Sequence, residues 1–246
     1  MDSFAEPLTK LFQQTLIRAS EQQNNTSQIK VVYQCLGLIA KLFYSLNYQD
    51  LPEFFEENIK TWMEGFYQLL IAANIPALES DSDDQPGAQE ILKAQICENV
   101  AMYAIKYGEE FEGHLPDFVS AIWQLLTSTG LELKYDVLVS TALGFLGSVA
   151  EQTGNNKLFS EGEALKTICE QVIMPNIGFR QQDEELFEDN PEEWIRRDLE
   201  GSDQATRRRA ACDLIRSLSR NFEREITEIF GSHINTALDR YKGKQR

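Results

Sequence analysis

Apolar residues recur with the period of an α-helix along almost the whole of this 246-residue chain. In one stretch the spacing is three or four residues, which places six side chains on a single helical face. These residues are Ile29, Val32, Leu36, Ile39, Phe43 and Leu46. Few segments alternate polar and apolar residues as a strand does. The sequence therefore predicts an all-α fold.

A short proline motif repeats along the chain, which favours a helical array over a bundle. An apolar residue, a proline, any residue and a second apolar residue occur at 51–54, 115–118 and 174–177. The intervals, from 51 to 115 and from 115 to 174, exceed the ~40 to 47 residues of a HEAT or armadillo unit. A polar insert such as residues 79–87 lengthens a repeat without changing its helices.

We therefore expect a right-handed α-α superhelix, a HEAT/armadillo-type solenoid, as one segment over residues 1–246. It has about four to five helix pairs with loop insertions. The approximate repeats are 4–46, 51–106, 109–152 and 161–221, the last with a charged insertion at about 181–203, and 222–241 is half a repeat. Solenoid units bury their apolar faces by stacking, so a final half repeat indicates an excised piece of a longer array.

The composition excludes several classes of partner. With 39 acidic and 23 basic side chains, the chain carries a net charge of −16. Nucleic acids and anionic lipid surfaces attract clustered Lys and Arg, and no apolar run approaches the ~18 residues of a membrane span. We therefore expect no nucleic acid and no membrane as partners. Without a signal peptide, an intracellular location is expected.

Motifs for catalysis are absent from the sequence. Its two histidines, His114 and His233, form no zinc-protease pattern, and there is no phosphate-binding glycine loop or nucleophile elbow. The four cysteines are far apart, so neither a disulfide framework nor a metal site is indicated. We expect no enzyme activity, no cofactor and no metal.

One segment carries more charge than helix packing requires. Acidic residues from Asp183 to Glu193 are followed by the arginine triplet Arg207, Arg208 and Arg209. The candidate partner-binding residues are Glu192, Glu193, Trp194, Arg196, Arg197, Asp198, Glu200, Arg207, Arg208 and Arg209.

Two interpretations of this segment stay open. Three arginines in a first helical turn oppose the helix dipole unless carboxylates neutralise them, and Glu192, Glu193, Asp198 and Glu200 are close enough in sequence. An internal salt-bridge network that holds the insertion is therefore as well supported as a partner site. Trp194 either anchors the insertion to the solenoid or contacts a partner.

Three stretches resemble the CAS-type exportins, receptors of the importin-β superfamily that return importin-α to the cytoplasm. They are 41–55 (KLFYSLNYQDLPEFF), 134–140 (KYDVLVS) and the run from 192–203 (EEWIRRDLEGSD) into 207–215 (RRRAACDLI). The resemblance extends from about residue 7 to about residue 241. It implies a monomeric, non-catalytic transport receptor segment that binds Ran in its GTP form and importin-α and shuttles between nucleus and cytoplasm, with Ran touching the insertion.

A second interpretation needs no transport function. The chain could be a generic HEAT-repeat scaffold subunit of another intracellular complex, in which the charged insertion is only a structural tether.

Overall fold

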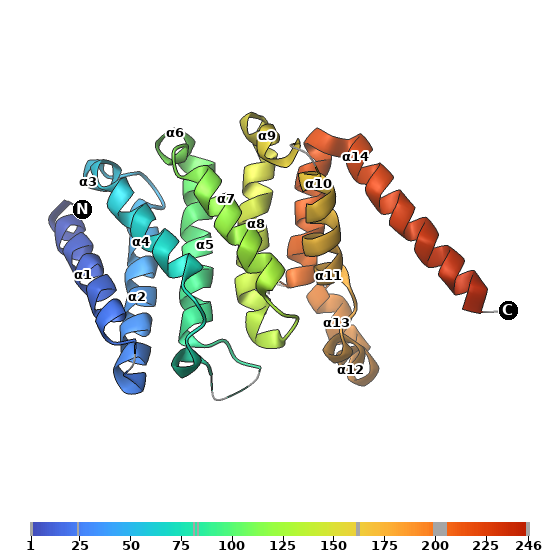
Figure 1. Ribbon diagram of the computed structural model, residues 1–246, viewed down its shortest axis with the longest axis horizontal. Helices are drawn as coiled ribbons and strands as arrows, with labels where there is room; N and C mark the ends of the chain where they lie inside the picture. Colours follow the sequence, from blue (N-terminus) through green and yellow to red (C-terminus); the bar gives the residue numbers. More distant parts are fainter. Residues whose placement is uncertain are drawn as a thin grey trace. The chain divides into compact units, whose positions relative to one another are not determined.

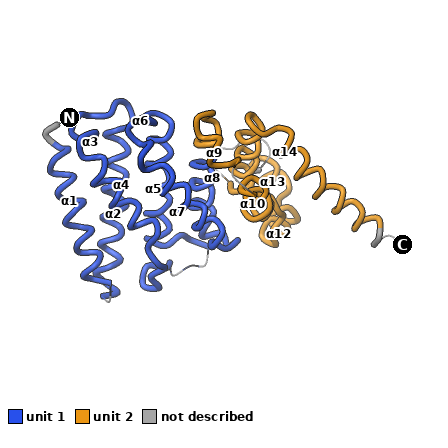
Figure 2. The backbone as a smooth tube through the Cα atoms, turned by 45° about the horizontal axis from the view of Figure 1, so that its top comes forward, with its two compact units in different colours: residues 1–146 blue, residues 147–246 orange. Residues whose placement is uncertain are grey.

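Helices make up most of the structure, which is a computed structural model (Figure 1). It describes residues 2–23, 25–80, 82, 84–160, 163–198 and 206–244. No strand occurs within these ranges, so the all-α prediction is confirmed. The chain forms two compact units, residues 1–146 and residues 147–246, which Figure 2 colours separately.

Unit 1 is built from helices in two layers (Figure 1). Helix α2 packs against α1 and α5, and α4 packs against α7. The helices are α1 (Asp2–Glu21), α2 (Thr26–Asn47), α3 (Glu53–Glu57), α4 (Ile59–Ile71), η1 (Pro76–Leu78), α5 (Ala88–Lys106), α6 (Gly108–Phe111), α7 (Leu115–Ser128), η2 (Leu133–Tyr135) and the first part of α8 (Asp136–Glu151).

Helix starts and breaks follow from local residue chemistry. Pro52 precedes α3 and Pro116 lies in the first turn of α7, where the missing N–H of proline costs nothing. The helical stretch that begins with α3 is interrupted at Asn58, whose backbone is not helical. Its side-chain amide donates to the carbonyl oxygen of Phe54 at 2.8 Å, and such local bonds compete with the helix.

A stack of aromatic rings joins α1, α2 and α4. Trp62 is fully buried, with its ring centroid 4.3 Å from that of Phe12 and 4.2 Å from that of Phe43. Its indole Nε1 donates to Thr9 Oγ1 at 3.0 Å. Buried aromatic side chains contribute much of a core's stability, and a buried indole needs such an acceptor. The core of unit 1 therefore lies between its two layers.

Two helical stretches are long and apolar enough to cross a membrane, Thr26–Asn47 and Leu133–Glu151. The expectation that no stretch reaches this length and composition is therefore too strong. Of their most apolar windows, 39% and 56% are buried within the protein, and core helices of soluble proteins pass the same test. These helices are weak evidence for a membrane.

Unit 2 contains the end of α8 and the shorter helices that follow it. They are η3 (Thr153–Asn155), α9 (Asn156–Ser160), α10 (Ala164–Thr167), the π-helix η4 (Ile168–Ile173), α11 (Met174–Ile177), α12 (Gln181–Asp189), α13 (Pro191–Asp198) and α14 (Arg207–Lys244). Helix α14 packs against η4 and α11. It kinks at Phe222, whose φ of −135° and ψ of 38° are not helical. The grouping of helices into repeats stays a prediction.

Candidate partner-binding site

The described part of the charged insertion is a pair of short helices, α12 and α13, and the expected loop is thus wrong for residues 181–198. Asp183 accepts a hydrogen bond from the backbone N–H of Arg180 at 3.0 Å and so caps α12. Asn190 Oδ1 accepts from the N–H of Glu193 at 3.2 Å and caps α13. Acidic residues in both first turns also favour the positive ends of the helix dipoles.

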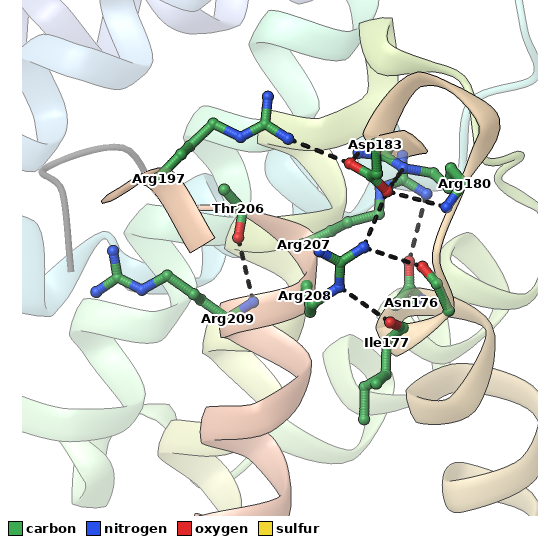
Figure 3. Close-up of polar contacts among 10 residues, drawn as sticks. Asn176, Ile177, Arg180, Asp183, Arg197, Thr206, Arg207, Arg208 and Arg209 are labelled. Atoms are coloured by element: carbon green, nitrogen blue, oxygen red, sulfur yellow. Dashed lines mark hydrogen bonds and ion pairs between the residues drawn. The ribbon is translucent and has the colours of Figure 1, made fainter. Parts of the chain in front are cut away.

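One buried carboxylate gathers three arginines from different segments (Figure 3). Asp183 is 1% exposed. Its Oδ2 lies 3.1 Å from Arg180 Nε and 2.9 Å from Arg208 Nη2, and its Oδ1 lies 3.1 Å from Arg197 Nη2. Because Arg197 belongs to α13 and Arg208 to α14, this Asp183 cluster ties the helix pair to α14.

The Asp183 carboxylate stays ionised despite its burial. Burial alone raises the pKa of Asp183, but hydrogen bonds from Arg180 and the positive charges of Arg180 and Arg208 outweigh it, so the net pKa is lowered. A carboxylate that accepts several charged hydrogen bonds is favoured in its ionised form. The cluster is therefore an ion-pair network at neutral pH.

Two arginines of the triplet, Arg207 and Arg208, also bind the C-terminal end of α11. Arg208 Nε donates to the carbonyl oxygen of Ile177 at 3.0 Å, and its Nη2 donates to that of Gly178 at 3.2 Å. Arg207, which is 2% exposed, donates from Nη1 to Asn176 Oδ1 at 3.3 Å. Guanidinium groups suit these positions because the last carbonyls of a helix lack partners and carry partial negative charge.

The start of α14 is capped within the described chain. Thr206 Oγ1 accepts from the backbone N–H of Arg209 at 3.2 Å (Figure 3). Thr206 is thus the N-cap of α14. Ser202 and Asp203 lie outside the described residues.

Three aromatic rings pack together where α12 and α13 meet the chain before them. The centroid of Trp194 lies 5.3 Å from that of Phe179 and 5.4 Å from that of Phe187. The guanidinium of Arg208 lies over the rings of Phe179 and Trp194, at 5.2 and 5.5 Å. Trp194 is half-buried. The structure thus favours the anchoring role for Trp194.

The ten predicted site residues separate into buried and exposed groups. Glu192, Glu193 and Arg196 are exposed, Arg207 is buried, and Trp194, Arg197, Arg208 and Arg209 are half-buried. The backbone of Asp198 ends α13, but its side chain and all of Glu200 lie outside the described residues.

Of the four carboxylates predicted to neutralise the arginines, the structure describes the side chains of Glu192 and Glu193. Glu192 and Glu193 are exposed and form no ion pair with an arginine in the described part of the chain. Asp183, by contrast, is buried, and it is the carboxylate that the three arginines of the cluster contact. Sequence reasoning missed Asp183, Arg180 and Asn176 as members of this site. The signal that could have found Asp183 is its place in the first turn of a helical pattern, because an acidic side chain at the third helical position can accept from the N-cap backbone N–H.

Comparison with known proteins gives consistent results for sequence and structure. The sequence model of the family described as Cse1 matches residues 1–246. The chain is 54% identical over 241 residues to exportin-2 of Xenopus laevis and of Homo sapiens, which covers 98% of this chain and 25% of theirs. The match to exportin-2 of Oreochromis niloticus is 53% over 246 residues.

A solved structure of the exportin Cse1 in its cargo-free, cytoplasmic state has the same fold. Its TM-score is 0.94 at 37% identity, and the match covers 98% of this chain and 26% of that one. The predicted helical solenoid is thus confirmed as the fold class. The chain spans 25% of the length of the exportin-2 relatives it matches.

Proposed function

This chain belongs to the Cse1 family, and we propose that it is a non-catalytic segment of a nuclear export receptor. It takes part in binding Ran in its GTP form together with importin-α, and the receptor shuttles between nucleus and cytoplasm with that cargo. The observation that carries the proposal is the α12–α13 pair, which the buried Asp183 cluster holds with a charged outer surface exposed to partners.

The charged groups of this segment divide into two functions. Arg180, Arg197 and Arg208 contact Asp183 and hold the helix pair in place. The outer surface of α12 and α13 carries exposed acidic residues, with exposed Arg196 among them. These acidic residues are Glu184, Glu185, Glu188, Asp189, Glu192 and Glu193. Such a surface attracts a partner with basic side chains and fixes its orientation.

An aromatic side chain lies exposed within this acidic surface. Phe187 is 45% exposed and contacts Trp194, which fixes its ring at the junction of α12 and α13. Interfaces commonly combine a central apolar anchor with a polar rim. The partner surface we propose therefore consists of Phe187, Glu192, Glu193 and Arg196, with the Asp183 cluster as its support.

Transport by such a receptor requires no active site in this chain. Ran-GTP and importin-α each strengthen the binding of the other, which is a coupling free energy between two sites. Hydrolysis of the GTP on Ran removes the Ran form that binds, so cargo is released. The nucleotide on Ran thus supplies the energy, and the receptor supplies surfaces.

A binding measurement with both nucleotide forms of Ran tests this proposal. The immobilised chain is titrated with Ran carrying a non-hydrolysable GTP analogue or GDP, with and without importin-α. We expect the GTP form of Ran to bind weakly and to bind more tightly when importin-α is present. We expect the GDP form not to bind. Equal binding of both forms, or binding of neither with importin-α present, would contradict the proposal.

Charge reversal on the outer surface of α13 identifies the contact. Arg196→Glu changes an exposed residue outside the Asp183 cluster, and we expect it to weaken Ran-GTP binding about tenfold. The matched control is Arg216→Glu on α14, whose side chain is 75% exposed. Equal affinity of both variants and the unchanged chain would exclude Arg196 from the contact.

The generic scaffold interpretation is not favoured. A relative that is 54% identical across 98% of this chain is an exportin. In that interpretation the insertion is only a structural tether. A tether explains the Asp183 cluster, but it does not explain the exposed charged residues of α12 and α13.

A further inference from the structure

We propose that a groove between α2 and the start of α5 in unit 1 docks an acidic amphipathic helix of a partner protein. This α2–α5 groove has a volume of about 490 Å³ and is lined by Tyr33, Gly37, Leu38 and Ile91, with Lys30, Lys41, Leu78 and Glu79 among its other residues. It is independent of the function proposed above, because it lies in unit 1 and shares no residue with the α12–α13 surface.

The groove has a buried apolar floor and exposed apolar walls. Tyr33 and Leu78 are 4% and 1% exposed, whereas Leu38 and Ile91 are 63% and 45% exposed. At Gly37 a Cβ atom would meet no other atom within 4 Å, so the absence of a side chain leaves space there. Exposed apolar surface that continues into a hollow is typical of an interaction site.

The apolar surface continues along α2 beyond the groove. Val31 and Leu42 are 56% and 53% exposed. They stand seven residues before and four residues after Leu38, so all three lie on one side of the helix. From Val31 to Leu42 the stripe is about 16 Å long at 1.5 Å per residue. This length matches three turns of a docked helix with apolar residues at i, i+4 and i+7.

The charges around the α2–α5 groove favour an acidic partner helix. In a chain of net charge −16, the only charged residues of α2 are Lys30 and Lys41, and both line the groove. Neither forms an ion pair with any residue that the structure describes. The one acidic lining residue, Glu79, already accepts a hydrogen bond from Asn74 Nδ2 at 3.3 Å.

These charges favour a protein segment over an anionic membrane. A helix with acidic flanks places its carboxylates beside two lysines while its apolar side chains fill the groove. A lipid surface would bring the whole acidic chain close to many negative headgroups, and that repulsion acts over a Debye length of about 8 to 10 Å. A single acidic helix brings fewer negative charges to the chain than a lipid surface does, so the repulsion that it meets is smaller.

A designed peptide tests the groove without knowledge of the natural partner. The probe is a fluorescent helix of about 16 residues, with Leu at i, i+4, i+7 and i+11 and Glu on its other face. A scrambled peptide of the same composition is the reference, and binding to the whole chain is measured by anisotropy. We expect the amphipathic peptide to bind at least tenfold more tightly than the scrambled one. Equal binding of the two would overturn the proposal.

Filling the groove gives a matched pair of variants. Gly37→Leu places a side chain in the open space at the centre of the groove, and we expect loss of peptide binding. Gly144→Leu on α8 is the control, because a Cβ there also meets no atom within 4 Å, and we expect unchanged binding. Thermal unfolding confirms that both variants fold. Unchanged binding by folded Gly37→Leu would overturn the proposal.

Charge reversal and other occupants complete the test. The double change Lys30→Glu and Lys41→Glu is expected to weaken binding of the acidic peptide at least tenfold and to remove the salt dependence of that binding. Vesicles of equal parts phosphatidylserine and phosphatidylcholine are not expected to bind. Vesicle binding that Gly37→Leu abolishes would assign the groove to lipid instead. Self-association of the unchanged chain, lost in Gly37→Leu, would assign it to a second copy, and either result overturns the proposal.

Discussion

Arg180, Arg197 and Arg208 come from three segments of the chain and meet at the carboxylate of Asp183 (Figure 3). A buried ion pair costs desolvation energy when it forms, so its net contribution to stability is small. Removing one partner is different, because the charges that remain buried are then uncompensated. Asp183 is thus the residue on which the position of α12 and α13 depends most.

Replacing this carboxylate by an amide should destabilise unit 2 strongly. We expect Asp183→Asn to lower the free energy of unfolding by about 3 to 5 kcal/mol, the cost typical of breaking a buried pair. Urea denaturation followed by circular dichroism measures it. The control is Asp189→Asn, an exposed residue of the same helix. A loss no larger than that of the control would mean that the arginines do not depend on Asp183.

The contribution of Asp183 to the free energy of unfolding should vary with pH in a defined direction. The folded pKa of Asp183 is lowered below its ordinary value, which is about 3.9 in an unfolded chain. The contribution is therefore complete above about pH 4 and is lost as the pH falls through the lower folded pKa. We expect the stability difference between the unchanged chain and Asp183→Asn to shrink only below about pH 4. A difference that already disappears near pH 6 would contradict this assignment.

The helices α12 and α13 show where sequence reasoning succeeds and where it stops. The segment 181–203 stood out because its charges exceed what packing needs, and Arg197 and Arg208 are indeed held by ion pairs. The pairing itself was not predictable from proximity in sequence. Glu192 and Glu193 are nearer to Arg197 along the chain, but both are exposed, and Arg197 pairs with Asp183 instead. Only the fold brings Asp183 into contact with Arg197.

Loosening the attachment of the helix pair should be visible in hydrogen exchange. Arg208 joins α14 to Asp183 and to the carbonyl oxygens of Ile177 and Gly178. We expect Arg208→Ala to speed amide exchange in residues 181–198 while α1 to α5 exchange as before. Arg216→Ala, an exposed change on the same helix, is the control. Equal exchange in 181–198 for both variants would mean that other contacts hold the pair.

At the scale of the whole molecule, the fold was the most predictable property. Apolar residues with a period near 3.6 predict helices regardless of how the helices later pack. Breaks such as that at Asn58 escaped prediction, because they depend on which carbonyl a side-chain amide reaches. The exposed apolar stripe of α2 was not predicted from the sequence either. Periodicity shows that a face is apolar, but not whether another element covers it.

Cysteine reactivity reports on the packing of both units at once. None of the four cysteines, all of which the structure describes, forms a disulfide; Cys35 is exposed, and Cys97 and Cys169 are buried. Burial raises the pKa of the Cys97 thiol to about 12 and that of Cys169 to about 11, so few thiolates form there at pH 8. We expect a thiol reagent to modify Cys35 rapidly in the folded chain and all four after unfolding. Rapid reaction of Cys97 in folded Cys35→Ser would contradict the core described here.

In the function proposed above, the exposed surface of α12 and α13 contacts Ran in its GTP form. Hydrogen exchange of the chain with and without Ran, read peptide by peptide, tests it most directly. With Ran-GTP and importin-α present, we expect slower exchange in residues 181–198, and with Ran-GDP we expect no change there. If Ran-GTP binds and slows exchange elsewhere while residues 181–198 exchange as in the free chain, the contact assigned to this surface is wrong.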